Sequence, residues 1–351
     1  MIVEIISPLH IGSGRELMPS DFVVRGDKIY VIDADKVFNE LIKIGVYDLL
    51  EFEKYPMEGI IEKYNLNLED VSLYSIKFEC EKAKESMGIR EFIKCNNKPF
   101  IPATSVKGAI RTALMYYVLK ENDVLLEEGI KMALKTSPKK ADDYLEAKIF
   151  GYVEDRRGLR HDGKFDILRA LIIRDSGLID LDKLKVKLVE IVNNSRSIPI
   201  RCEVLEDVKI EMDMFIDYDL LKNFDFNGEI DNINFDEKLL KNAIREFAND
   251  LIDAELSEIY KFGRYKDKVR DFYINLKQRI KNGDLLLRLG WGVSYYGVSI
   301  GLLLRGHPKF YALRKKFGLG RNPKKGFLVN SFPSTRRVCN SQPMGWVRLK
   351  I

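Results

Sequence analysis

The stretch from Leu285 to Tyr311 places the strongest constraint on how this chain folds. It begins with an apolar run, Leu285–Leu289, which predicts a β-strand, and continues into a loop that contains Gly290, Gly292 and Gly297. Glycine allows the backbone to turn through positive φ and to approach a neighbouring group closely. The loop can therefore present backbone N–H groups to the oxygens of a phosphate.

Aromatic and basic side chains surround these glycines, namely Arg288, Trp291, Tyr295, Tyr296 and Arg305. Aromatic rings stack on bases and cations pair with phosphates, a combination typical of single-strand nucleic-acid sites. The same pattern also occurs where a glycine-rich strand–loop–helix unit buries its aromatic residues in a core. The sequence leaves both interpretations open, above all for Trp291.

The distribution of charge favours a polyanionic partner. No Asp or Glu follows Asp284, whereas thirteen Lys and Arg do; because the whole chain carries +5, residues 1–284 carry −8. Such asymmetry indicates a nucleic-acid partner, and an anionic membrane surface fits less well because no basic helix here has a long apolar face. The candidate RNA-binding cations downstream of the glycine loop are Arg314, Lys315, Lys316, Arg321, Lys324, Lys325, Arg336 and Arg337.

Composition excludes several other classes of protein. The longest apolar stretch, Val293–Leu304, is short and interrupted by glycines and serines, so we expect a soluble, cytoplasmic protein that does not cross a membrane. The four cysteines show no Cys-x-x-Cys spacing, and the three histidines are not paired at ligand spacing. We therefore predict no metal site and no cofactor, although a magnesium ion held by carboxylates would leave no such signature.

The N-terminus contains a second candidate loop. Ile2–Ile6 is predicted to be the first strand, and the segment Pro8–Arg15 that follows is predicted to be a loop. This segment supplies further candidate RNA contacts, His10, Gly12, Ser13, Gly14 and Arg15. Phe22–Arg25 and Lys28–Ile32 then predict a hairpin, with Asp33 as the N-cap of the next helix.

A third candidate lies at a predicted helix start. Strands at 92–94 and 100–101 bracket Asn96–Asn97 and lead into a helix with Thr104 or Ser105 as its N-cap. A helix N-terminus binds anions, and Lys107 and Arg111 lie four residues apart on one face. We expect this start and the loop at 12–14 to form one anion-binding floor. The alternative is a capped helix with solvated cations.

The remaining pattern predicts two domains, 1–177 and 178–351. The first contains a polar insertion at about 121–166 and regains an apolar strand at Leu171–Ile173. The second begins with a predicted hairpin, 198–205 with 209–216, and contains a helical insertion at about 236–282 before the basic C-terminal segment.

In order along the chain, four segments resemble the signatures of CRISPR-associated RAMP proteins. They are Pro8–Gly14 (PLHIGSG), Ile101–Arg111 (IPATSVKGAIR), Arg174–Ser176 (RDS) and Leu289–Gly297 (LGWGVSYYG). The ending, FPSTRRV at 332–338 with GWVRL at 345–349, resembles more specifically the family formed by the fifth subunit of the type III-A effector, the Csm complex. One departure is Ala103, where relatives more often have Gly.

This resemblance implies an α+β fold of two ferredoxin-like (RRM-like) domains with helical insertions. It also implies binding of CRISPR RNA (crRNA), including through Arg174, at the end of the complex that holds the 3′ portion of the RNA. The implied partners are the repeated backbone subunit, other Csm subunits and the host nucleases that trim the crRNA 3′ end. The implied role is crRNA 3′-end maturation in antiviral defence.

Two other classes of function compete with RNA binding. Some RAMP proteins are metal-independent endoribonucleases that process precursor crRNA, and His10 could be the general base of such an enzyme. However, no second histidine or carboxylate has a recognisable spacing to His10, so we expect a binding protein and not an enzyme. A scaffold that touches only protein would leave the thirteen C-terminal cations unexplained.

Overall fold

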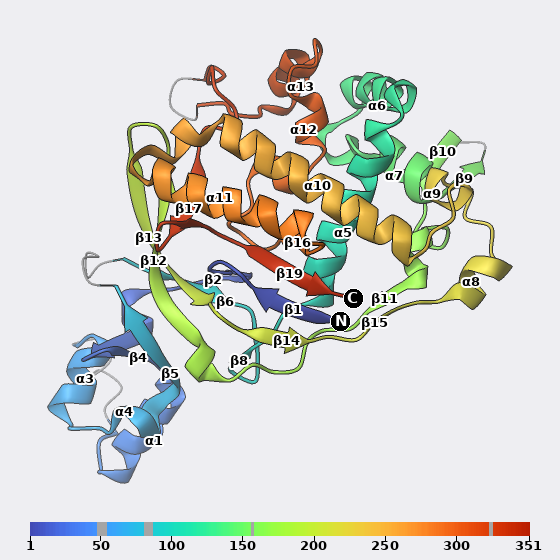
Figure 1. The fold of residues 1–351 in the computed structure, drawn as a ribbon. Helices are drawn as coiled ribbons and strands as arrows, with labels where there is room; N and C mark the ends of the chain where they lie inside the picture. Colours follow the sequence, from blue (N-terminus) through green and yellow to red (C-terminus); the bar gives the residue numbers. More distant parts are fainter. Residues whose placement is uncertain (48–54, 81–86, 156–157, 323–325) are drawn as a thin grey trace.

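The structure is a computed structural model that describes residues 1–47, 55–80, 87–155, 158–322 and 326–351. Two β-sheets form its framework, and helices pack mainly against the smaller sheet (Figure 1). Within these residues, no helix is long and apolar enough to cross a membrane. The result is a mixed α+β fold.

The smaller sheet has four antiparallel strands in the order β14-β1-β19-β16. They are β1 (Ile2–Ile5), β14 (Lys209–Glu211), β16 (Leu285–Arg288) and β19 (Trp346–Lys350). Helices α5 (Ala103–Lys120) and α10 (Glu237–Ser257) share a hydrophobic core with this sheet. The strands at 2–6 and 285–289 were predicted, and both are confirmed to within one residue.

In the described residues the larger sheet has nine strands, seven of them in the order β2-β6-β13-β12-β5-β4-β3; β17 pairs with β12, and β18 pairs with β17. They are β2 (Gly12–Leu17), β3 (Phe22–Arg25), β4 (Lys28–Ile32), β5 (Ser72–Glu79), β6 (Ile89–Phe92), β12 (Leu184–Val192), β13 (Ser197–Leu205), β17 (Arg336–Cys339) and β18 (Gln342–Pro343). The long β12–β13 pair is antiparallel, whereas β5 joins β12 in parallel.

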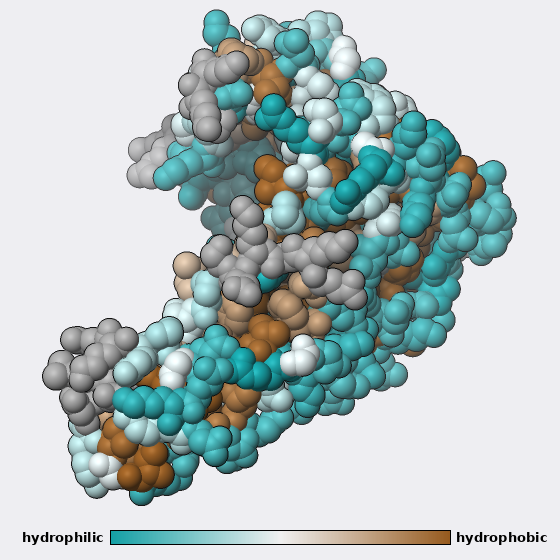
Figure 2. Space-filling model, turned by 90° about the vertical axis from the view of Figure 1, so that its left-hand side faces the viewer, coloured by the Kyte–Doolittle hydropathy of each residue, from teal (hydrophilic) through white to brown (hydrophobic). Residues whose placement is uncertain are grey.

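A small lobe projects from one end of the larger sheet (Figure 1). Its described residues form the predicted β3–β4 hairpin and the helices α1 (Ala34–Lys43), α3 (Met57–Lys63) and α4 (Leu68–Val71), around a separate apolar core. Asp33 caps α1 as predicted, since its carboxylate accepts from the N–H groups of Asp35 and Lys36. Figure 2 shows that the surface is hollowed between this lobe and the rest of the molecule.

Most of the remaining elements are helical. Between α5 and the second half of the chain lie α6 (Asp123–Lys135), η2 (Pro138–Lys140), α7 (Asp143–Phe150), β9 (Tyr152–Asp155), β10 (Gly158–His161), η3 (Ile167–Ala170) and β11 (Leu171–Ile173). The second half contains η4 (Leu181–Lys183), β15 (Met214–Ile216), α8 (Tyr218–Asn223), α9 (Glu229–Asn232), η5 (Ile259–Tyr265), α11 (Lys266–Lys281), η6 (Tyr295–Gly297), α12 (Gly301–Leu304) and α13 (Phe310–Phe317). Short elements elsewhere are η1 (Pro19–Asp21), β7 (Lys94–Cys95) and β8 (Lys98–Pro99).

One predicted hairpin is wrong. The strand at 197–205 pairs with β12 and not with 209–216, because β14 instead forms an edge of the smaller sheet against β1. Both sheets therefore combine strands from the two sides of the boundary at 177/178. The division into two domains at that boundary stays a prediction.

Candidate nucleic-acid interface

The segments after β1 and β16 meet at one point of the molecule. The Trp291 N–H donates to the carbonyl oxygen of His10 over 2.9 Å, and a Cβ atom on Gly290 would collide with that same carbonyl. Gly290 also has φ of +77°, so glycine is required there for two reasons. A Cβ on Gly292 would likewise collide with Met344. These two glycines of the predicted anion-binding loop therefore serve close packing within the chain.

His10 lies under this junction with 2% of its surface exposed. Its Nδ1 is 2.7 Å from the carbonyl oxygen of Glu203, which fixes Nδ1 as the donor. Burial lowers the pKa of His10 to about 4, the Glu203 hydrogen bond opposes this shift, and the charges of Arg90 and Lys94 add to it. The ring is therefore neutral at neutral pH.

A cavity of about 530 Å³ opens beside His10. It is lined by His10, Ile11, Gly12, Gly14, Arg15, Glu16, Arg90, Glu91, Gly290 and Trp291. The sequence predicted a loop over Pro8–Arg15, but Gly12–Leu17 forms edge strand β2, which pairs with β6 and is exposed except at its last residue. Two of the predicted signatures therefore lie side by side at this cavity.

Polar side chains of β2 reach neighbours within the chain. The Ser13 hydroxyl donates to Glu91 over 2.9 Å, and the Arg15 guanidinium lies 3.7 Å from Asp21 with more than half of its side chain exposed. Arg15 is therefore accessible to an anion, because an exposed ion pair of this length is weak.

Trp291 is half-buried and packs against an apolar cluster that includes Cys202 and Met344. Its ring also contacts two guanidinium groups, with Cζ of Arg90 at 4.3 Å and Cζ of Arg337 at 5.0 Å from the ring centroid. Trp291 is thus neither a fully buried core residue nor a free stacking platform. The sequence analysis missed Arg90, whose only signal was a cation between the apolar residues Ile89 and Phe92 of a short strand.

Two of the predicted RNA-binding arginines are buried in an ionic cluster with Glu255 of helix α10 and Glu258, the C-cap residue of that helix. Arg288 lies 3.3 Å from Glu255, and Arg336 contacts both Glu255 and Glu258. The Arg336 side chain is fully buried. Burial alone would raise the pKa of Glu255, but the two guanidinium groups hold it below its ordinary value. In this fold neither arginine can reach RNA, so their charges serve the structure.

The other C-terminal cations differ in accessibility. Arg314 is buried and donates to the carbonyl oxygens of Leu319 and Val329, whereas Lys315 and Arg321 are exposed. Arg305 contacts Ser257 at 2.9 Å and Glu258 at 3.5 Å, Lys316 donates to the Leu134 carbonyl over 2.6 Å, and Arg174 lies 3.5 Å from Asp213. Lys324 and Lys325 lie outside the described residues.

The start of helix α5 differs from the prediction. Its N-cap is Pro102 and not Thr104 or Ser105, and the Asp175 carboxylate accepts from the Ala103 N–H over 2.6 Å. The neighbouring Ser176 hydroxyl accepts from the Ile101 N–H over 2.8 Å. The Arg174–Ser176 signature therefore caps this helix, which already holds a carboxylate where an anion was expected.

The cations of α5 are also engaged within the chain. Lys107 donates to the Leu171 carbonyl over 2.9 Å, and burial lowers its pKa. Arg111 forms ion pairs with Glu146 and with Asp166, the latter at 2.7 Å. The cap residue Asp175 lines a different pocket with Met1 and Ile2, at the opposite end of β1 from His10. The predicted shared anion-binding floor is therefore wrong.

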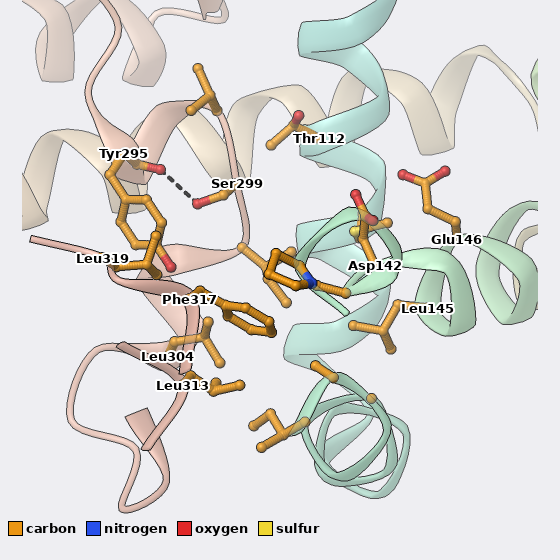
Figure 3. A pocket seen from close by; sticks show the side chains of 18 of the residues that line it. Thr112, Asp142, Leu145, Glu146, Tyr295, Ser299, Leu304, Leu313, Phe317 and Leu319 are labelled. Atoms are coloured by element: carbon orange, nitrogen blue, oxygen red, sulfur yellow. Dashed lines mark hydrogen bonds between the residues drawn. The ribbon is translucent and has the colours of Figure 1, made fainter. Parts of the chain in front are cut away.

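A second cavity, of about 280 Å³, lies between α5, the α6–α7 insertion and the segment from Tyr295 to Leu319 (Figure 3). Its wall is largely apolar, and Leu145, Leu304, Leu313 and Phe317 point into it in the figure. Tyr295 belongs to this wall and packs on Phe310 and Phe332. Tyr295 is thus placed away from the His10 cavity.

Comparison with known proteins identifies the family. Residues 2–296 match the family model of the RAMP superfamily. The Methanocaldococcus jannaschii protein named "CRISPR system Cms protein Csm5" is 25% identical over 99% of this chain and 88% of its own length. A chain of the structure described as a Csm-crRNA-target RNA ternary complex of a type III-A CRISPR-Cas system is 34% identical, with a TM-score of 0.86 over 99% of both chains. The crystal structure of T. onnurineus Csm5 is 32% identical, with a TM-score of 0.73 over 99% of this chain and all of that one. The chain belongs to the RAMP superfamily and, within it, is a homologue of Csm5.

Proposed function

We propose that this chain is a crRNA-binding subunit of a type III-A Csm effector complex. The observation that carries the proposal is the match, at 34% identity and over 99% of both chains, to a chain of a Csm-crRNA-target RNA ternary complex. The exposed cations Lys315 and Arg321 of the basic C-terminal segment support it, because phosphate neutralisation dominates the affinity of RNA-binding proteins. The partners are accordingly crRNA and the other Csm subunits.

The finer parts of the proposal come from the family resemblance. The chain caps the end of the complex that holds the crRNA 3′ portion, contacts the repeated backbone subunit, and is needed for 3′-end maturation by host nucleases in the cytoplasm. Its architecture is two ferredoxin-like domains. The four-stranded antiparallel sheet covered by α5 and α10 supports that description.

We further propose that the chain binds RNA without cleaving it. A general base must reach its proton and have a pKa near the working pH. His10 is buried, its Nδ1 is occupied, and its pKa of about 4 is far below neutrality. The alternative, a metal-independent endoribonuclease with His10 as its base, is therefore not favoured.

One incubation tests both parts of this proposal. The purified chain is incubated with end-labelled repeat–spacer RNA, with and without EDTA, and the products are resolved under native and denaturing conditions. We expect a shifted band of intact RNA in both cases. Absence of a shift at low salt would contradict RNA binding. Cleavage that persists in EDTA and is abolished by His10→Ala would favour the nuclease.

A further inference from the structure

Two arginines from distant parts of the chain are held against one tryptophan. Arg90 comes from β6 and Arg337 from β17, which lie on opposite sides of the β13–β12 pair in the larger sheet. Both guanidinium groups contact the Trp291 ring, and the His10 ring meets Trp291 edge-on at 6.0 Å. The three side chains form one surface cluster beside the His10 cavity, which Arg90 and Trp291 also line.

The charges of this cluster are not compensated. In the part of the chain that the structure describes, neither Arg90 nor Arg337 forms an ion pair with a carboxylate, and the buried Nε of Arg337 has no hydrogen-bond partner. Burial lowers the pKa of Arg337, and repulsion from Arg288, Arg90 and Arg336 lowers it further. The residue before it, Arg336, shows the contrast, because two glutamates neutralise it.

In the described residues, the nearby carboxylates form no ion pair with Arg90 or Arg337. Glu91 accepts from Ser13 and lies 3.7 Å from Lys94, and Glu203 is bound by Tyr74, Phe92 and Lys94. Glu16 lines the same cavity and stands opposite Arg90 in the β2–β6 pair, and its carboxylate lies beside Gly88 without an ion pair to Arg90 in the described residues. A partly buried guanidinium without a counter-charge is costly, so the arrangement is explained if an anion completes it.

We propose that Arg90 and Arg337 bind phosphate groups of a single RNA strand that crosses the sheet beside the His10 cavity, with Trp291 holding both guanidinium groups in place. This inference rests on the proposed RNA-binding function and specifies which groups contact the RNA. A planar guanidinium group donates two parallel hydrogen bonds to two oxygens of one phosphate. Its contact with the aromatic ring fixes its orientation. Such contacts read the backbone and carry no base preference.

Support of two arginines by Trp291 and stacking of Trp291 on a base predict different effects of a Trp291 substitution on RNA binding. Loss of a stacked base lowers affinity and leaves the number of phosphate contacts unchanged. Loss of a support for two arginines instead removes phosphate contacts. The salt dependence of binding separates the two, because each lost contact reduces the magnitude of the negative slope of log K against log salt by about 0.7 for single strands.

The test measures binding of the full-length chain to two single-stranded RNAs of unrelated sequence across a series of salt concentrations. The variants are Arg90→Gln, Arg337→Gln and Trp291→Leu, and the matched control is Arg270→Gln. Arg270 lies on α11, is 45% exposed and pairs with Asp267, so that this change removes one charge away from the cluster. Thermal unfolding of each variant confirms that it is folded.

We expect Arg90→Gln and Arg337→Gln to weaken binding to both RNAs, each by roughly tenfold, the low end for hydrogen bonds to charged groups. In each arginine variant the magnitude of the slope of log K against log salt is reduced by about 0.7, and in Trp291→Leu it is reduced by up to twice that amount. Arg270→Gln changes neither the affinity for RNA nor the slope. If the wild type binds RNA but the cluster variants behave like the control, the inference fails while the proposed function stands. If Trp291→Leu weakens binding with an unchanged slope, the tryptophan stacks a base and the support role is refuted. If the wild type does not bind, the proposed function itself fails.

Discussion

Neighbouring arginines on strand β17 are expected to respond in opposite ways to the same substitution. Arg336→Met removes a guanidinium that donates to Glu255, Glu258 and two backbone carbonyls in a fully buried place. Removal of one partner from a buried ion pair costs about 3–5 kcal/mol. Because Arg288 still neutralises Glu255, the loss should lie near the lower end, about 3 kcal/mol. Arg337→Met removes no ion pair and should cost less than about 1 kcal/mol.

Equilibrium unfolding in urea measures the loss of stability in both variants. An unchanged slope m shows that each variant exposes the same surface on unfolding as the wild type. Arg336→Met should leave the salt dependence of RNA binding unchanged once the protein is folded, whereas Arg337→Met should lower it. Equal losses of stability for the two variants, or a stable Arg336→Met variant with impaired phosphate binding, would refute the assignment of Arg336 to the structure.

Three further outcomes are expected. Asp175→Ala should lower the free energy of unfolding by about 1 kcal/mol, since it removes the acceptor for the Ala103 N–H at the start of α5. Urea unfolding measures this loss, with Asp175→Asn as the control that keeps an acceptor oxygen. Because its folded pKa of about 4 lies below the unfolded value of 6.5, His10 contributes stability that is present above pH 6.5 and is lost as the pH falls towards 4, by about 3 kcal/mol in total. Unfolding at several pH values should show this loss in the wild type and a smaller one in His10→Asn; identical profiles would contradict it. Arg111→Ala should lower stability and leave the RNA salt slope unchanged, because Glu146 and Asp166 already neutralise Arg111; a lowered slope in the titration would show that it meets phosphate.

Local patterns in the sequence predicted much of the secondary structure. The helical insertion expected at about 236–282 contains α10 and α11, and the asymmetric charge and the RAMP signatures pointed to the family that the comparisons show. Pairing between distant strands could not be predicted in the same way. Apolar and polar residues alternate in the segment 209–216 as in the second strand of a hairpin. Its first part, β14, instead pairs with β1 at the N-terminus of the chain.

The sequence also could not separate structural from exposed cations. Arg336 and Arg337 are adjacent and chemically identical, and only the fold places one between two glutamates and the other against a tryptophan. The same limit applies to Gly290, which an anion-binding loop and a close backbone contact would both require. The role of Arg90 depends on Trp291, two hundred residues away in the chain, and no local pattern connects them.

Photocrosslinking in an assembled Csm complex tests the central claim most directly. Complexes that contain this chain are reconstituted with crRNA carrying one photoreactive nucleotide, either in the 3′ portion or in the 5′ portion, and the labelled subunit is identified after irradiation. We predict that this chain is labelled from the 3′ portion, with the RNA otherwise intact. Labelling from the 5′ portion alone, or no labelling of this chain from either position, would contradict the proposal that it binds crRNA at the 3′ end of the complex.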